Sequence, residues 1–249
     1  MNRLVKAEWF RVRKSSGIMK WLIIICLLIL VIPFLDDVSS GKITATSYFM
    51  AFEEQACMFI PLFLSALAGA FAGMSFNNKT ALYEVMAGNK IWNIINSKLL
   101  VIVPLISLLF SGLFAALLGI FGIVNGTGEL KQLPLRMLLL FIIVLHVVVV
   151  AVLAVTSVRH ILGIGIGFLR FAMLEEILVI WIQIAAENAS TELETVQKMS
   201  SWFVQNQIIS LNMETIPTYF VVRVILSLVI EATVWYVISY IGYKRKKFQ

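Results

Sequence analysis

Charged residues are scarce in this sequence of 249 residues, in which Asp, Glu, Lys and Arg together make up only 14% of the chain. Soluble domains carry about a quarter charged residues, whereas 60% of this chain is hydrophobic. So many apolar side chains can be exposed only where lipid forms part of the solvent. The composition therefore excludes a soluble enzyme, a disordered regulator and a secreted disulfide-rich scaffold.

Cysteine and histidine are also rare, with two of each. Cys26 and Cys57 lie in apolar runs without the spacing of metal ligands, so we expect no metal site and no reactive thiolate. We expect His146 to be a packed or hydrogen-bonded helix residue and His160 to be an interfacial base.

Motifs of common enzyme classes are absent as well. The sequence contains no Gly-x-x-x-x-Gly-Lys-Ser/Thr phosphate loop, no His-Glu-x-x-His and no Gly-x-Ser-x-Gly. Glu175 and Glu176 begin the Glu-Glu-x-x-x-Arg pattern of membrane-embedded prenyl-protein-processing proteases, but Ile180 occupies the arginine position and no histidine follows. We therefore expect a membrane protein that is not an enzyme and holds no cofactor.

Six stretches are long and apolar enough to cross a bilayer, since a transmembrane helix needs about 20 mostly apolar residues. They cover residues 19–35, 55–76, 98–121, 136–156, 161–183 and 217–241. Only residues 157–160 separate the fourth stretch from the fifth, so the two could instead form one long kinked helix. A single helix of that length would overshoot the bilayer, so we expect two separate spans. The sequence predicts an all-α polytopic protein with six transmembrane helices in one transmembrane domain, residues 1–249.

Basic residues are distributed unequally around these spans. With the N-terminus in the cytoplasm, the inner segments hold fourteen: Arg3, Lys6, Arg11, Arg13, Lys14, Lys20, Lys79, Lys90, Lys98, Arg159, Lys244, Arg245, Lys246 and Lys247. The outer segments hold four: Lys42, Lys131, Arg136 and Lys198. The positive-inside rule therefore predicts both termini in the cytoplasm. The net charge of +6 reflects this orientation, so we expect no nucleic-acid partner.

The N-terminal segment, residues 1–17, has an amphipathic pattern. On a helical wheel the apolar side holds Leu4, Val5, Trp9 and Val12, and the basic side holds Arg3, Lys6, Arg13 and Lys14. This pattern predicts an interfacial elbow helix on the inner leaflet, with its basic edge toward anionic headgroups. The alternative is a solvated basic tail.

The inner loop of residues 77–97 contains a predicted short helix. Asn78 can cap a helix that begins near Thr80, and Gly88 can end it. A minimal connector between two spans needs no such helix, so it indicates docking to a cytoplasmic partner, with packing on the bilayer as the alternative. The candidate docking residues are Thr80, Leu82, Tyr83, Glu84, Val85, Met86 and Gly88.

The outer segment of residues 185–216 is too long for a simple turn. A capping box at Thr191–Glu194 predicts a helix through Met199. A second amphipathic piece, Ser201 to Leu211, follows it. We expect these short outer helices to lie in the outer interface before the last span.

Charged residues at membrane depth are costly and need partners. At about 1.5 Å rise per residue, Arg170 and Glu231 lie about 13 and 15 Å from the inner ends of their spans. This depth match predicts an ion pair between them, and a similar match pairs Glu175 or Glu176 with Arg223. The functional alternative is that these charges line a translocation path.

The second span carries a stripe of small residues, Ala66, Gly69, Ala70 and Gly73, which includes a Gly-x-x-x-Gly pattern. Such stripes let helices approach closely. We expect Gly69 and Gly73 to lie on a helix-packing face or at a subunit interface.

Two of these segments carry a family resemblance. The basic amphipathic run Arg3–Arg11 leads into the first span, and the loop after the second reads Glu84–Trp92 and then Asn96–Leu99. Together they resemble the permease subunits of bacterial ABC-2-type exporters. The small permeases that serve bacteriocin, lantibiotic and amphipathic-peptide export or immunity are the most similar.

The resemblance implies a function. In this family the first inner loop holds a coupling helix that docks on a separate ABC ATPase subunit, which binds ATP and Mg²⁺. The outer helices help to close the exit. Two permease chains, identical or siblings, form the pathway in the bacterial cell membrane. The implied substrate is hydrophobic or amphipathic, most simply a peptide, and it is exported.

Two other readings remain open. The first is a standalone membrane-embedded immunity or sensory binding protein without an ATPase. The second is a secondary transporter, which usually shows internal repeats, but no symmetry relates residues 1–125 to residues 126–249. Co-purification of an ATPase would separate the exporter from both.

Overall fold

The computed structural model describes residues 1–37, 43–78, 80–128, 131–160, 162–188 and 199–245, and every regular element among them is a helix. The first half contains α1 (Asn2–Lys14), α2 (Ser16–Asp37), α3 (Ala45–Ala56), α4 (Phe59–Asn77), α5 (Thr80–Met86) and α6 (Ile91–Asn125). The second half contains α7 (Leu133–Val158), α8 (Gly163–Leu169), the π-helix η1 (Arg170–Leu174), α9 (Glu175–Asn188), α11 (Val204–Ser210) and α12 (Thr218–Arg245).

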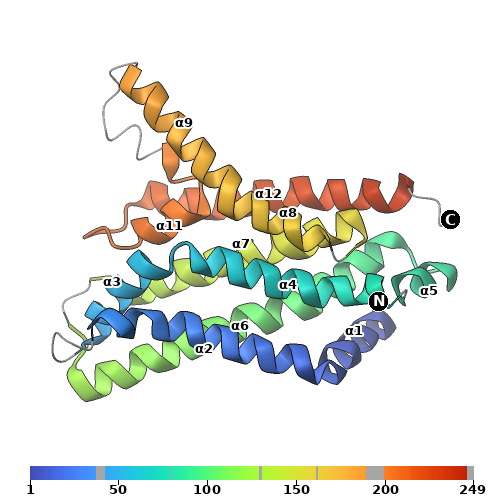
Figure 1. Ribbon diagram of the computed structural model, residues 1–249, viewed down its shortest axis with the longest axis horizontal. Helices are drawn as coiled ribbons and strands as arrows, with labels where there is room; N and C mark the ends of the chain where they lie inside the picture. Colours follow the sequence, from blue (N-terminus) through green and yellow to red (C-terminus); the bar gives the residue numbers. More distant parts are fainter. Residues whose placement is uncertain (38–42, 79, 129–130, 161, 189–198, 246–249) are drawn as a thin grey trace.

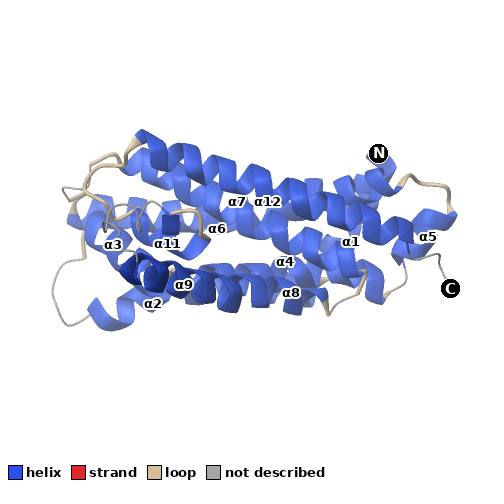
Figure 2. Ribbon diagram, turned by 90° about the horizontal axis from the view of Figure 1, so that it is seen from above, coloured by secondary structure: helices blue, strands red, loops and turns tan. Residues whose placement is uncertain are grey.

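The long helices lie side by side in an elongated bundle (Figure 1). The N-terminus, α1, α5 and the end of α12 lie at one end of the bundle, and α3 and α11 lie at the other, as Figure 2 also shows. The positive-inside rule predicts that the first of these ends is cytoplasmic, and we use this prediction only to name the two ends the inner and the outer end.

Four described helices are long and apolar enough to cross a membrane: α4, α6, α7 and α12. A fifth candidate is the pair formed by α1 and α2, which pass the same test together but meet at an angle of 73°. The predicted fifth span, residues 161–183, is divided among α8, η1 and α9, none of which is long enough alone. The described residues therefore form an all-helical, multi-pass membrane protein with four to five candidate spans.

The centre of the bundle is α7, which packs against α4, α6, α8 and α12. Most side chains between Leu139 and Val155 are buried, and the others are partly buried. In contrast, α12 buries few side chains and exposes Val222, Ile225 and Val229. A helix that is apolar on all sides is stable in an apolar medium, so the exposed face of α12 is suited to contact with lipid or another protein.

Glycines allow the closest helix contacts. A Cβ atom on Gly69 of α4 would lie 2.9 Å from Cγ1 of Ile164 and 3.1 Å from Cγ2 of Val155. Gly73 is buried on the same helix. Gly69 of the predicted small-residue stripe therefore lies where α4 packs closely against α7 and α8. On α12, a Cβ at Gly242 would lie 2.5 Å from the carbonyl oxygen of Ser157, a close contact that the sequence analysis missed.

The sequence analysis also missed α3, because it began the second span at residue 55. The side chain of Thr44 accepts a hydrogen bond from the backbone N–H of Ser47 at 3.2 Å, and Ser47 reciprocates, which forms a capping box. Behind this cap, the rings of Phe49 and Phe52 pack on Phe114 of α6. A local cap and an aromatic cluster thus make a separate helix before α4.

The short inner helix is present as α5 and begins at Thr80 as predicted, with one error in the residue predicted to cap it. Asn78 is the C-cap of α4, where its N–H reaches the carbonyls of Met74 and Phe76, so its predicted role as the N-cap of α5 is wrong. Gly88 has φ +78° just after α5, as expected for a helix terminator.

The third span is longer than predicted. α6 has 35 residues, against the predicted range 98–121. At 1.5 Å per residue this is about 50 Å, well beyond a hydrocarbon core of about 30 Å. The extra turns begin at Ile91, so α6 continues into the inner end and approaches α5.

The outer segment agrees in part with its prediction. The helix expected to run through Met199 lies almost wholly outside the described residues. The second amphipathic piece is present as α11, which is shorter than the predicted Ser201–Leu211 and buries Val204, Gln207 and Ile208.

Candidate functional site: a charge network inside the bundle

Arg170 and Glu231 form a bidentate ion pair between η1 and α12. The Arg170 Nε atom lies 2.6 Å from Glu231 Oε1, and Nη2 lies 3.0 Å from Oε2. The two side chains are only 16% and 17% exposed. This geometry joins η1 to α12 with the pairing that the depth match predicts.

Glu175, one of the two carboxylates predicted as alternatives for Arg223, pairs with Arg170 instead. Its Oε1 atom lies 3.0 Å from Arg170 Nη1, and the backbone N–H groups of Val204 and Gln205 each donate to the carboxylate at 3.2 Å. Glu175 thus links the centre of the bundle to the start of α11. The other predicted partner of Arg223, Glu176, has a side chain outside the described part of the chain.

Arg223 lies in an aromatic setting near the outer segment. Its Nη1 donates to Ser201 Oγ at 2.8 Å, and its guanidinium lies 5.3 Å from the ring centre of Tyr219 and 6.0 Å from that of Trp202. Cation–π contacts of this kind stabilise a cation in apolar surroundings.

His146 is a member of this network that the sequence analysis did not identify. It is buried on α7, and its Nε2 atom lies 3.0 Å from Glu231 Oε2. We define the charge network as Arg170, Glu175, Glu231 and His146. It joins four elements of the bundle and, through Glu175, the outer helix α11.

The π-helix η1 explains why Arg170 and Glu175 face the same partners. In an α-helix, residues five apart point in directions about 140° apart. The i→i+5 hydrogen bonding of a π-helix brings them onto one face. η1 begins at Arg170 and ends just before Glu175, so both side chains reach the same network. Hydrophobic periodicity does not reveal such a local change.

A groove of about 410 Å³ opens beside the ion pair. It is lined by Arg170, Trp202, Ser227, Ile230, Glu231, Val234, Trp235 and Ile238. Six of these eight residues belong to α12, and five of the eight are aliphatic or aromatic, whereas Arg170, Ser227 and Glu231 are polar. A groove with apolar walls and a few convergent polar groups is suited to an amphipathic ligand.

A second charge network lies at the inner end of the bundle. Lys98 of α6 is fully buried, with its Nζ atom 2.5 Å from Glu8 Oε1 and 2.5 Å from Ser75 Oγ. Glu8 in turn pairs with Arg11, and Arg11 pairs with Glu84 of α5, each at 2.8 Å. This chain of contacts, which the sequence analysis missed, connects α5 through α1 to α6.

The candidate docking residues on α5 divide into two sets. Tyr83 and Met86 point away from the protein, with 64% and 72% exposure. Glu84 and Thr80 face inward, where Glu84 pairs with Arg11 and Thr80 Oγ1 donates to a carbonyl of α4 at 3.0 Å. Val85 packs partly against the inner core, and the side chain of Leu82 lies outside the described residues.

At the outer end, Arg136 is buried rather than exposed in a loop. It donates to the carbonyls of Lys131 at 2.8 Å, Met213 at 2.6 Å and Glu214 at 3.1 Å, and also to that of Leu211. Arg136 therefore holds the segment that leads from α11 to α12 against the start of α7.

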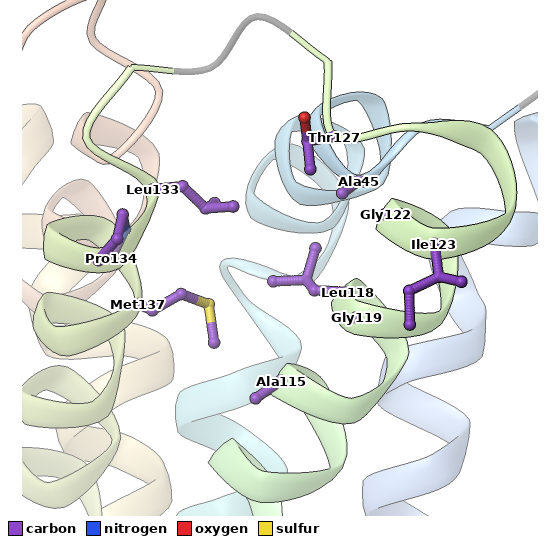
Figure 3. Close-up of a pocket in the computed structure, with 10 residues that line it drawn as sticks. All are labelled: Ala45, Ala115, Leu118, Gly119, Gly122, Ile123, Thr127, Leu133, Pro134 and Met137. Atoms are coloured by element: carbon purple, nitrogen blue, oxygen red, sulfur yellow. The ribbon is translucent and has the colours of Figure 1, made fainter.

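Figure 3 shows a second cavity, of about 470 Å³, near the outer ends of α3, α6 and α7. Ala115, Gly119 and Gly122 form its α6 wall, Met137 projects into it from α7, and Thr127 is its polar member. Such a lining offers no catalytic chemistry. Among the described residues, no cluster of His, Cys, Asp and Glu could hold a metal ion.

The sequence matches no protein-family model, and no curated protein matches it. The functional assignment therefore depends on the site geometry and on the resemblance given above.

Proposed function

We propose that this chain is the permease subunit of an ATP-driven ABC-2-type exporter. In this proposal α2 and the helical run α8–η1–α9 are the first and fifth of six spans, and α1 is the interfacial elbow. Both termini lie in the cytoplasm of a bacterial cell. ATP and Mg²⁺ bind to a separate ATPase subunit.

The observation that carries the proposal is the construction of α5. Its outward side chains, Tyr83 and Met86, form an exposed apolar surface, while its inward Glu84 is connected through Arg11 and Glu8 to the membrane helices. A helix that only lay on the bilayer would need no ionic connection to the bundle. A helix that transmits movement from a docked subunit would need one.

The groove beside Arg170 and Glu231 supports a hydrophobic or amphipathic substrate, such as a peptide. Because its walls come largely from the exposed helix α12, a second permease copy or a sibling chain would complete the pathway. The permease would contribute a difference in affinity between two conformations rather than bond-making chemistry.

A pull-down of the tagged chain in mild detergent tests the proposal, with mass identification of every co-purifying protein. The double variant Tyr83→Asp with Met86→Asp removes the apolar docking surface. The matched control is Ile123→Asp, which changes an 88% exposed residue near the outer end.

We expect an ATPase with a phosphate loop to co-purify with the parent and the control but not with the double variant. Equal recovery with all three chains would mean that α5 is not the docking site. Absence of an ATPase under several gentle conditions would favour the standalone binding protein.

A further inference from the structure

A cavity of about 400 Å³ lies at the elbow, between α1 and the end of α4. From α1 it is lined by Phe10, Arg11 and Lys14, and from the end of α4 by Met74 and Asn78. These residues place both cations and apolar groups around one space. The described residues that line the cavity include no carboxylate.

The positive charge of the cavity comes from Lys14. Arg11 is paired with Glu8 and Glu84, so its charge is already offset. Lys14 is exposed, lies 5.9 Å from the ring centre of Phe10, and forms no ion pair with any other described residue. A ligand with a negative charge would therefore be attracted to the Lys14 side of the cavity.

The remaining lining groups indicate what kind of anion fits. The side-chain amide of Asn78 can donate a hydrogen bond, and within the described chain it has no other partner. Phe10 is 64% exposed, and Met74 is half-buried beside it. These two side chains offer an apolar surface that a small inorganic anion would not use.

The position of the cavity identifies where such a ligand would come from. α1 turns by 73° into the following helix at this point, and its exposed side chains include both apolar and basic residues. A helix of this type lies in the plane of the interface, at the level of the lipid headgroups.

We propose that the elbow cavity binds one anionic phospholipid of the inner leaflet. The phosphate lies at Lys14 and Asn78, and the upper part of the acyl chains lies against Phe10 and Met74. The lipid site does not depend on a partner ATPase, so its test is independent of the test of the proposed exporter function.

Native mass spectrometry of the purified full chain tests this site, by titration with phosphatidylglycerol or with phosphatidylethanolamine of the same acyl chains. The test variant is Lys14→Gln. The matched control is Lys6→Gln, which removes the same charge from the same helix outside the cavity. A competition arm adds free glycerol 3-phosphate.

We expect one phosphatidylglycerol to bind in preference to phosphatidylethanolamine. Its binding should be about fivefold weaker in Lys14→Gln, because one interfacial lysine contributes about that factor to the affinity for an anionic lipid. Binding should change little in Lys6→Gln. Equal losses in the two variants would mean diffuse attraction to the helix and would overturn the site. Equal binding of both lipids would overturn anion recognition. Competition by glycerol 3-phosphate at the same concentration as the lipid would overturn a lipid ligand in favour of a soluble phosphate.

Discussion

The pairing of Arg170 with Glu231 gives a quantitative prediction for stability. In a dry interior each of their two hydrogen bonds would contribute about 1.5 kcal/mol or more, since both partners are charged. The side chains are 16% and 17% exposed, which weakens the interaction through screening. We therefore expect a coupling energy of about 2 kcal/mol in a double-mutant cycle.

The cycle uses Arg170→Gln and Glu231→Gln, which remove the charges but leave a polar amide; Glu231→Gln keeps the side-chain size, whereas Arg170→Gln shortens the side chain. A charge swap is a poorer test, because a carboxylate at position 170 would face Glu175, and a guanidinium at position 231 would face His146. The structure therefore predicts only partial rescue by the swap.

The assay is reversible unfolding in mixed detergent micelles, with the free energy of unfolding measured for the parent, both single variants and the double variant. The control cycle uses Lys131 and Glu214, which are 3.9 Å apart with side chains 69% and 89% exposed. We expect their coupling to stay below about 0.5 kcal/mol. If the Arg170–Glu231 coupling were as small as the control, the charge network would not stabilise the bundle as we argue.

Two further stability predictions use the same unfolding assay. Gly163→Ala should destabilise the protein by about 1–3 kcal/mol, because the new Cβ would lie 2.6 Å from the Cα of Val155. The control Gly165→Ala places its Cβ in open space and should leave the stability unchanged. Equal effects of the two substitutions would refute the close packing at Gly163. Lys98→Met should cost about 3 kcal/mol by leaving Glu8 without its buried partner, and adding Glu8→Gln should restore part of the loss. Failure of that second change to restore stability would contradict the ion pair.

The depth of charged residues could be predicted from the sequence because helical rise is regular. The pairing of Arg170 with Glu231 followed from counting residues from the inner ends of two antiparallel spans. The partner of Glu175 did not follow, because the π-helix rotates the chain between Arg170 and Glu175. One local departure from α-helical geometry was enough to give Arg170 a second carboxylate partner, Glu175, beside the predicted Glu231.

Contacts between distant segments were the least predictable part of the site. Lys98 was counted with the basic residues of the inner side, but the fold buries it against Glu8, 90 residues away in the chain. Likewise, nothing in the sequence near His146 indicates that its partner is on α12. The presence and ends of α5 were better predicted, because Gly88 has a local conformational role.

Photo-crosslinking from position 83 in intact cells tests the central claim most directly. A benzophenone side chain in place of Tyr83 lies on the exposed face of α5, and the same probe in place of Ile123 serves as the control at the outer end. Our account predicts a crosslink from position 83, absent from position 123, to an ATPase that contains a phosphate loop. Crosslinks to lipid alone at position 83 would contradict it and would make α5 a helix that only packs on the bilayer.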